Sequence, residues 1–274
     1  MRLNRFLAAA GLGSRRACDE LIRSGAVVIN GTHIAELATQ VEPGDDVRVH
    51  GRQVRVARAV TLLFNKPRGY LVTRSDERGR RTIYDLLPPE FSALFHVGRL
   101  DKESEGLLLL TNDGDLAQRL THPSHEIEKE YEVTLDKAFD AAHSAKLLKG
   151  FHIEGGRARF ESLRPLAPDR LKVVLRQGLK RQIRLMFYAL GYEVVRLKRT
   201  RIGGVSDPRI PSGSCRHLTA RELASLSAPS SASLPRSGRK PASAAPRRTP
   251  ARTPARTPAR KGPPRLGARR KTAG

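Results

Sequence analysis

The sequence contains little cysteine, no long hydrophobic run and none of the common cofactor motifs. Cys18 and Cys215 lie far apart without a metal-binding spacing, so we expect two reduced thiols. No stretch is apolar enough for a transmembrane helix, and the basic N-terminus lacks a signal-peptide core. There is no glycine-rich phosphate loop, dinucleotide fingerprint or His/Cys cluster. We therefore predict a cytoplasmic protein with no membrane association and no metal or nucleotide cofactor.

Acidic residues are scarce relative to basic ones. The chain has 51 Lys and Arg against 27 Asp and Glu, a formal net charge of +24. Residues 227–274 contain 13 basic and no acidic residues, so they contribute +13 and the rest of the chain +11. Because the excess is far larger than solubility requires, it indicates a polyanionic partner such as a nucleic acid. The body of the chain stays basic even without its C-terminal segment.

Composition and pattern divide the chain into three segments. Residues 1–59 read as two helices followed by short strands, with Ser14 capping the second helix and a turn at Asn30-Gly31. Residues 60–226 mix strands and helices without regular alternation, which predicts an α+β domain with a mixed or antiparallel sheet. Residues 227–274 are rich in Pro, Ala, Ser and Arg and have almost no large apolar side chain, so we predict a disordered basic tail.

The central segment carries the clearest periodic patterns. We predict strands at 60–64, 107–111, 130–135, 158–164 and 171–175, and helices at 114–120, 139–148 and 179–190. A capping box from Thr219 to Glu222 predicts the start of a last helix.

One carboxylate stands out by its position. Asp101 follows Arg99 in a polar loop, directly before the apolar run 107–111 that we interpret as a buried strand. A loop at the end of a rigid sheet is where catalytic groups are usefully held. Taken alone, however, an aspartate in a loop is more often a turn former or an ion-pair partner.

Several blocks of this sequence, in order, resemble motifs of RsuA-like RNA pseudouridine synthases. They are Asn65–Tyr70, Gly98–Gly114 around Asp101, Glu128–Tyr131, Gly178–Phe187 and Arg199–Gly203. In the first segment, Ser14–Ala17, Leu21–Gly25 and Val28–Gly31 resemble the S4 RNA-binding module. The resemblance implies an S4 RNA-binding domain at 1–59, a pseudouridine synthase catalytic domain at 60–226 and a tail at 227–274.

The resemblance also implies roles for individual residues. Asp101 corresponds to the catalytic carboxylate, and Tyr131 to the aromatic ring that stacks on the target base, although a tyrosine in a strand is often core packing. We expect Arg184, on the same helix face as Lys180, to keep Asp101 ionised. Arg99 either replaces the flipped nucleotide, holds phosphates or pairs with an acid. The predicted RNA contacts are Arg2, Arg5, Arg15, Arg16, Arg23, Lys66, Arg99, Lys180 and Arg181.

The function implied by the resemblance is that of a cofactor-free isomerase. It would convert one uridine of ribosomal RNA to pseudouridine, with 23S preferred because the blocks at 102–104, 128–131 and 177–179 and the basic tail look more like large-subunit members. The expected partner is ribosomal RNA or a ribosomal subunit precursor, and the expected state is a monomer. Alternatives are a 16S-specific synthase, or a non-catalytic RNA-binding assembly factor with the same fold. A hydrolase would need a positioned water and usually a second acid.

Overall fold

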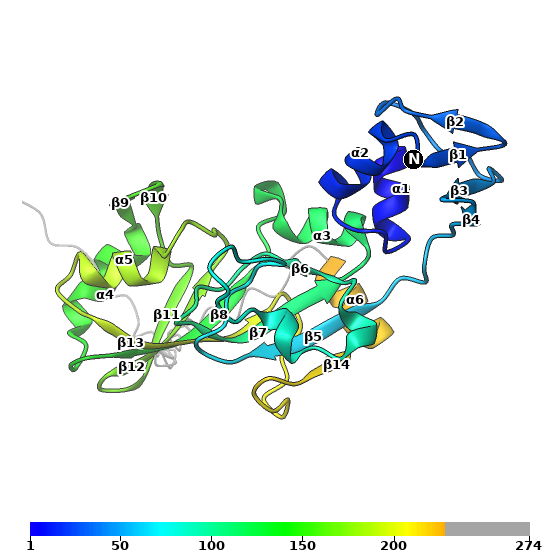
Figure 1. Cartoon of the computed structure of the whole chain (residues 1–274). Coiled ribbons are helices and arrows are strands. Elements are labelled where there is room, and N and C mark those ends of the chain that lie inside the picture. The colour runs from blue at the N-terminus through cyan, green and yellow to red at the C-terminus, as the bar shows by residue number, and fades with distance from the viewer. Residues whose placement is uncertain (228–274) are drawn as a thin grey trace, which may run out of the picture. The chain divides into compact units, whose positions relative to one another are not determined.

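The computed structural model describes residues 1–227 (Figure 1). Its first part begins with two helices, α1 (Leu3–Ala9) and α2 (Arg15–Arg23). An antiparallel sheet of four strands follows in the order β2-β1-β3-β4, formed by β1 (Val27–Ile29), β2 (Thr32–Ile34), β3 (Val47–Val49) and β4 (Arg52–Gln53). The predicted cap is confirmed, since the Ser14 hydroxyl accepts from the Ala17 N–H at 3.1 Å. Asn30 and Gly31 both have positive φ, as a tight hairpin turn requires.

The rest of the described chain is built on an eight-stranded mixed sheet, which confirms the predicted α+β class. Its path is β11-β12-β8-β13-β7-β5-β14, with β6 also paired to β7. All its pairs are antiparallel except β13 with β7. The strands are β5 (Thr61–Lys66), β6 (Phe95–Val97), β7 (Glu105–Thr111), β8 (Lys129–Leu135), β11 (Ser162–Ala167), β12 (Arg170–Leu175), β13 (Val194–Ile202) and β14 (Cys215–His217).

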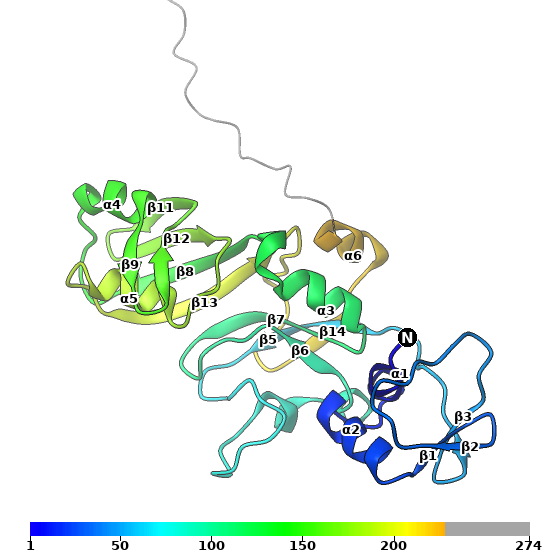
Figure 2. The same cartoon turned by 90° about the horizontal axis from the view of Figure 1, so that it is seen from above.

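Helices cover both faces of this sheet. They are α3 (Gly114–Thr121), α4 (Ser144–Lys149), α5 (Gln182–Tyr188) and α6 (Ala220–Ser227), with short 3-10 turns at Ile83–Leu86, Pro89–Phe91, Pro123–His125 and Ala141–His143. A small hairpin of β9 (Phe151–Ile153) and β10 (Gly156–Ala158) lies near α5. Figure 2 shows α3 and α6 side by side. Among residues 1–227, no helix is long and apolar enough to cross a membrane.

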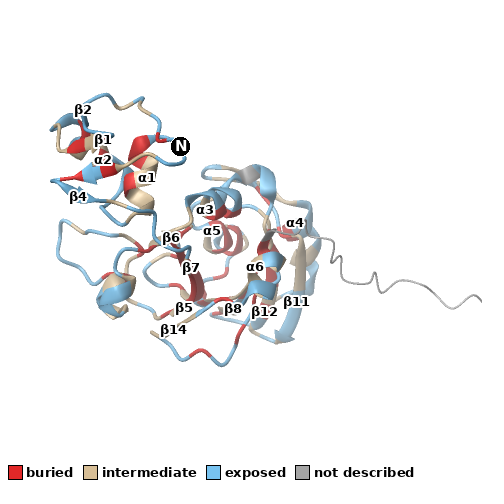
Figure 3. Ribbon diagram, turned by 90° about the vertical axis from the view of Figure 1, so that its right-hand side faces the viewer, coloured by how far each residue is buried: buried red, intermediate tan, exposed pale blue. Residues whose placement is uncertain are grey.

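The central strands are apolar because both of their faces are buried. On β7, Leu108 and Leu110 join a core with α4 and α5, whereas Leu107 and Leu109 join a second core with α3 and α6. Figure 3 shows β7 coloured as buried. A strand covered on both sides reads as a continuous apolar run rather than an alternating one. This burial on both faces explains why β7, the strand that follows Asp101, is rigid.

Several predicted elements differ from the structure. The strand expected at 158–164 is divided between β10 and β11, and the helix expected at 139–148 begins only at Ser144, after a 3-10 turn. The helix expected at 179–190 begins at Gln182, because Arg181 adopts a left-handed conformation with φ of 53°. Lys180 and Arg184 therefore do not share a helix face. Strands β6, β9, β13 and β14 were not predicted, and the predicted disordered tail lies outside the described residues beyond Ser227.

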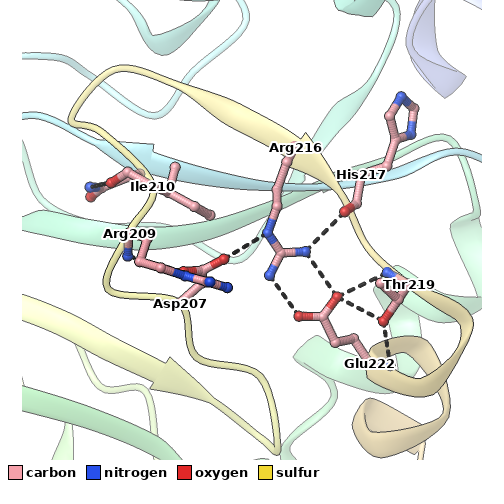
Figure 4. A network of polar contacts seen from close by, with 8 residues as sticks. Asp207, Arg209, Ile210, Arg216, His217, Thr219 and Glu222 are labelled. Carbon is pink, nitrogen blue, oxygen red and sulfur yellow. Dashed lines mark hydrogen bonds and ion pairs between the residues drawn. The ribbon is translucent and has the colours of Figure 1, made fainter.

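A polar network fixes the last helix to the sheet (Figure 4). Arg216 on β14 donates to Asp207 at 2.9 Å and to both carboxylate oxygens of Glu222 at 2.6 and 2.9 Å. Glu222 also accepts from the N–H of Thr219, whose hydroxyl accepts from the N–H of Glu222, which confirms the predicted capping box. The guanidinium of Arg216 lowers the pKa of Glu222 to about 2.

Candidate active site

The loop that carries Asp101 is held by backbone hydrogen bonds from both sides. Its turn is closed by the Ser104 N–H, which donates to the Asp101 carbonyl at 3.0 Å, and the Gly69 N–H donates to the Lys102 carbonyl at 2.8 Å. Leu100 is buried in the core beside Asp101. Within residues 1–227, neither a hydrogen bond nor an ion pair reaches the Asp101 carboxylate. The backbone at Asp101 is therefore held in place, while its carboxylate has no partner among the described residues.

Lys66 holds the same loop from inside the protein. Its side chain is 0% exposed, and Nζ donates to the carbonyls of Pro67, Lys102 and Ser104 at 2.9, 3.3 and 2.7 Å. Burial lowers the pKa of Lys66 to about 8, although the carboxylates of Glu103 and Asp101 act against the shift. The prediction of Lys66 as an RNA contact is wrong, because its ammonium is enclosed by backbone carbonyls. It stabilises the Asp101 loop instead.

Strand β8 presents Tyr131 and Lys129 on one face. The two residues are two positions apart in a strand, so their side chains point the same way. Tyr131 is 8% exposed and its hydroxyl has no hydrogen-bond partner in the described part of the chain. The Lys129 ammonium donates to the Ile127 carbonyl at 3.0 Å, and burial, followed by the charge of Arg199, lowers the pKa of Lys129 to about 8.

A cavity of about 1000 Å³ brings these groups together. Asp101, Lys129, Tyr131 and Arg199 all contribute to its lining, as do the predicted RNA contacts Arg99, Lys180 and Arg181. This volume is that of a large ligand pocket and accommodates a nucleotide. A carboxylate, an aromatic ring and several cations in one cavity suit a flipped nucleotide with its negatively charged phosphates. In the part of the chain that the structure describes, no cluster of three metal-ligating side chains is present.

Arg184 lies close to Asp101 but does not pair with it. Its Nη1 donates to the Val194 carbonyl at 2.6 Å and its Nη2 to the Glu103 carbonyl at 3.4 Å. No ion pair joins Arg184 and Asp101 among the described residues. Burial and the neighbouring Arg181 lower the pKa of Arg184, while the Asp101 carboxylate acts in the opposite direction. Arg184 thus contributes positive charge near Asp101 and supports its loop through Glu103, but the expected direct contact is not made.

The other predicted RNA contacts fall into two groups. Arg5 forms an ion pair with Asp115, and this pairing raises the pKa of Arg5. The remaining cations are exposed, and their side chains make no hydrogen bond or ion pair within residues 1–227. They are Arg2, Arg15, Arg16 and Arg23 in the first part of the chain and Arg99, Lys180 and Arg181 at the cavity.

Sequence reasoning assigned no role to Lys129 and Arg199, which both line the cavity. For Lys129 a signal was available, because it belongs to the Glu128–Tyr131 block and lies two residues before Tyr131, directly before the strand predicted at 130–135. For Arg199 the signal was its place in the Arg199–Gly203 block, but the strand that carries it was not predicted.

Comparison with known proteins gives one consistent result. Residues 60–189 match the family described as RNA pseudouridylate synthase, and residues 1–47 match the S4 domain. An uncharacterised RNA pseudouridine synthase of Mycobacterium leprae (strain TN) is 41% identical, the match covering 82% of this chain and 92% of that protein. The ribosomal large subunit pseudouridine synthase B of Bacillus subtilis (strain 168) is 35% identical over 83% of this chain and 96% of its own. A solved pseudouridylate synthase structure is 31% identical with a TM-score of 0.61, covering 82% of this chain and 99% of that one.

Proposed function

This chain belongs to the RNA pseudouridine synthase family, and from that membership we propose that it isomerises one uridine of large-subunit (23S) ribosomal RNA. The family makes it an isomerase with an S4 RNA-binding domain. The choice of RNA is supported by the Bacillus subtilis relative, whose name gives the large ribosomal subunit. The observation that carries the proposal is the unpartnered Asp101 carboxylate in the same cavity as Tyr131.

In the proposed reaction the target uridine leaves its helix and enters the cavity, where its base stacks on Tyr131. The C1′–N1 bond breaks with its electron pair on the uracil, while Asp101 attacks or stabilises the electron-poor sugar. The uracil turns and C5 bonds to C1′; where Asp101 has attacked, its bond to C1′ breaks in this step and the carboxylate is released. The C5 proton is then lost and N1 is protonated, so product and substrate have the same atoms. Arg184 supports the loop that carries Asp101 through its hydrogen bond to the Glu103 carbonyl.

Binding of the RNA is assigned to the exposed cations. Arg2, Arg15, Arg16 and Arg23 of the S4 domain would position the RNA through its phosphates, and Arg99, Lys180 and Arg181 would hold the phosphates next to the target nucleotide. Arginine suits this role because its planar fork matches phosphate oxygens. We propose that the protein works as a cytoplasmic monomer on ribosomal RNA or a subunit precursor, without a metal or nucleotide cofactor.

The test uses 23S and 16S ribosomal RNA from a strain that lacks this gene. Purified protein should introduce one new carbodiimide-dependent primer-extension stop in 23S RNA and none in 16S RNA. Asp101→Asn should abolish this stop and keep RNA affinity, because a neutral amide has the shape of the carboxylate but not its charge. Glu103→Gln, an exposed carboxylate of the same loop, is the matched control and should retain activity. A stop in 16S RNA would establish the small-subunit alternative, and binding without any stop would establish the assembly factor.

A further inference from the structure

Arg199 is a buried cation that the described protein leaves almost without partners. It is 4% exposed, and the only hydrogen bond of its side chain within residues 1–227 runs from Nε to the Leu107 carbonyl at 2.6 Å. Nη2 is buried and has no partner. No carboxylate of the described chain forms an ion pair with it. A buried donor that meets no acceptor is costly, so such a group in a native protein calls for an explanation.

The sheet aims this side chain at the catalytic cavity. Arg199 lies directly opposite Tyr131 in the β13–β8 pairing, and side chains directly opposite one another in antiparallel strands share a face. On its other side, Arg199 is paired with Gly106 at the only parallel junction among the described strands. Arg199 therefore lines the cavity at a position between Tyr131 and the strand that follows Asp101.

An irregularity in β13 separates Arg199 from the acidic residues nearby. The register shifts between Arg199 and Arg201, so that Arg201 is opposite Glu130 rather than on the face of Tyr131. Arg201 contacts Glu128 at 3.4 Å and Glu130 at 3.7 Å. Without the bulge, residues two apart in a strand would share a face. The bulge thus gives Arg201 two carboxylates and leaves Arg199 facing the cavity.

We propose that Nη2 of Arg199 donates a hydrogen bond to a carbonyl oxygen of the flipped uracil. The interaction strengthens when the C1′–N1 bond breaks, because the electron pair of that bond passes to the uracil and is shared with its carbonyl oxygens. Arg199 keeps its proton throughout and returns to its starting state once C5 has bonded to C1′. A fixed, buried donor aimed at developing charge is an effective form of electrostatic catalysis. The inference rests on the proposed isomerase function.

The base is favoured over a phosphate as the partner of Arg199. The backbone of a flipped nucleotide stays at the mouth of a pocket while its base enters deepest. The exposed cations Arg99, Lys180 and Arg181 already line the cavity and can meet phosphates. Arg199 is buried in the sheet, where the uracil oxygens are the acceptors that reach it.

The test pairs a change in the protein with a change in one substrate atom. RNA with uridine, 2-thiouridine or 4-thiouridine at the target position is reacted with wild-type enzyme and with Arg199→Met in single turnovers at saturating RNA. Product nucleosides are separated by chromatography after nuclease digestion. With uridine, Arg199→Met should lower the rate roughly 100- to 1000-fold and leave RNA affinity within a few-fold. Arg196→Met, an exposed arginine of the same strand, is the control and should behave as wild type.

The decisive result is the response to sulfur, which is a weaker hydrogen-bond acceptor than oxygen. If sulfur replaces the uracil oxygen that Arg199 contacts, the single-turnover rate of the wild type and of Arg196→Met should fall at least about 10-fold. The rate of Arg199→Met should not fall further. Equal sulfur effects in all three proteins at both positions would overturn the inference. So would a loss of RNA affinity with a smaller salt dependence, which indicates that Arg199 binds a phosphate.

Two controls keep the result interpretable. Thermal unfolding checks the fold of Arg199→Met, and Arg199→Lys serves in its place if methionine is not tolerated. Lysine keeps the charge but not the fork, so it should retain part of the rate and of the sulfur effect. If the wild type leaves all-oxygen RNA unmodified, the proposed function itself fails, and the inference fails with it.

Discussion

Arg199 and Arg201 stand two residues apart on β13, yet their surroundings are opposite. Arg201 lies on the face where Glu128 and Glu130 form ion pairs with it, and where Arg176 and Lys172 complete the network. Arg199 lies on the face of Lys129 and Tyr131, where the one hydrogen bond of its side chain within the described residues goes to a backbone carbonyl. One face of the same pair of strands therefore satisfies its charges within the protein, and the other leaves them for a ligand.

This difference separates structural from functional positive charge. A paired cation leaves an uncompensated carboxylate behind when it is removed, so its loss costs stability. An unpaired buried cation is already costly to the fold, so its loss costs little stability and instead removes an interaction with the substrate. Arg201 and Arg199 therefore represent structural and functional positive charge, and substitutions can test each role separately.

The largest effect is expected at Gly106, which is paired with Arg199 where β7 meets β13. A Cβ at this position would lie 2.2 Å from the Arg199 carbonyl oxygen and 2.6 Å from its nitrogen, and the φ of +105° disfavours any side chain. Gly106→Ala should lower the free energy of unfolding by roughly 3–5 kcal/mol and displace Arg199. Gly79→Ala is the control: its φ is +64° but nothing lies within 4 Å, so about 1 kcal/mol is expected. Urea unfolding measures the stability of both variants. Equal losses of stability would show that the backbone around Gly106 shifts to make room for the added methyl group.

The second prediction compares the stability and the activity that are lost when Arg201 or Arg199 is replaced. Arg201→Met should lower the free energy of unfolding by about 1–3 kcal/mol, because Glu128 and Glu130 lose a partner. Arg199→Met should change it by less than about 1 kcal/mol or raise it, because no ion pair is removed. Single-turnover rates at saturating RNA should rank the variants in the opposite order. A stability loss at Arg199 as large as that at Arg201 would mean that Arg199 is structural.

The third prediction concerns Lys129, whose pKa burial lowers to about 8 from an ordinary value of 10.5. The unfolded chain holds this proton more tightly than the folded one, so between pH 8 and 10.5 stability should rise with pH. The cost of burying the charged form is fully present below pH 8 and is relieved above it. Lys129→Met should remove this part of the pH dependence, at most about 3 kcal/mol. The exposed Lys149→Met serves as control, and identical pH profiles for both variants would contradict the assignment.

Much of the fold was predictable because its signals are local. The apolar run of β7, the cap at Ser14, the turn at Asn30-Gly31 and the capping box of Thr219 each lie within a few residues. The motif around Asp101 was recognisable for the same reason. Tyr131 could be placed in a strand by alternation, and it lines the same cavity as Asp101.

What could not be predicted depends on partners distant in sequence. Strand β13 was missed because charged side chains occupy both of its faces, so no apolar alternation marks it. Its Arg201 is satisfied by acids of β8 and its Arg199 points to a cavity, which are facts of pairing and register. Lys66 was misassigned because a lysine in the Asn65–Tyr70 block suggests a phosphate contact, whereas its acceptors include carbonyls 36 and 38 residues away. Arg184 was placed near Asp101, but its hydrogen bonds go to backbone carbonyls.

The smallest effect is expected for cations that are unpaired and exposed. Arg15 and Arg16 begin α2 and have no side-chain partner in the described chain, so the cost of burial that marks Arg199 is absent. Arg15→Gln/Arg16→Gln should leave stability and the saturated rate unchanged. It should weaken RNA binding at low salt and reduce the slope of log affinity against log salt by about 1 for each phosphate that an arginine no longer neutralises. Arg48→Gln, whose arginine is paired with Asp46, is the control in the same domain and should keep the slope. If the double variant also keeps the wild-type slope, α2 does not contact the RNA backbone. These two arginines would then neither stabilise the fold nor bind RNA.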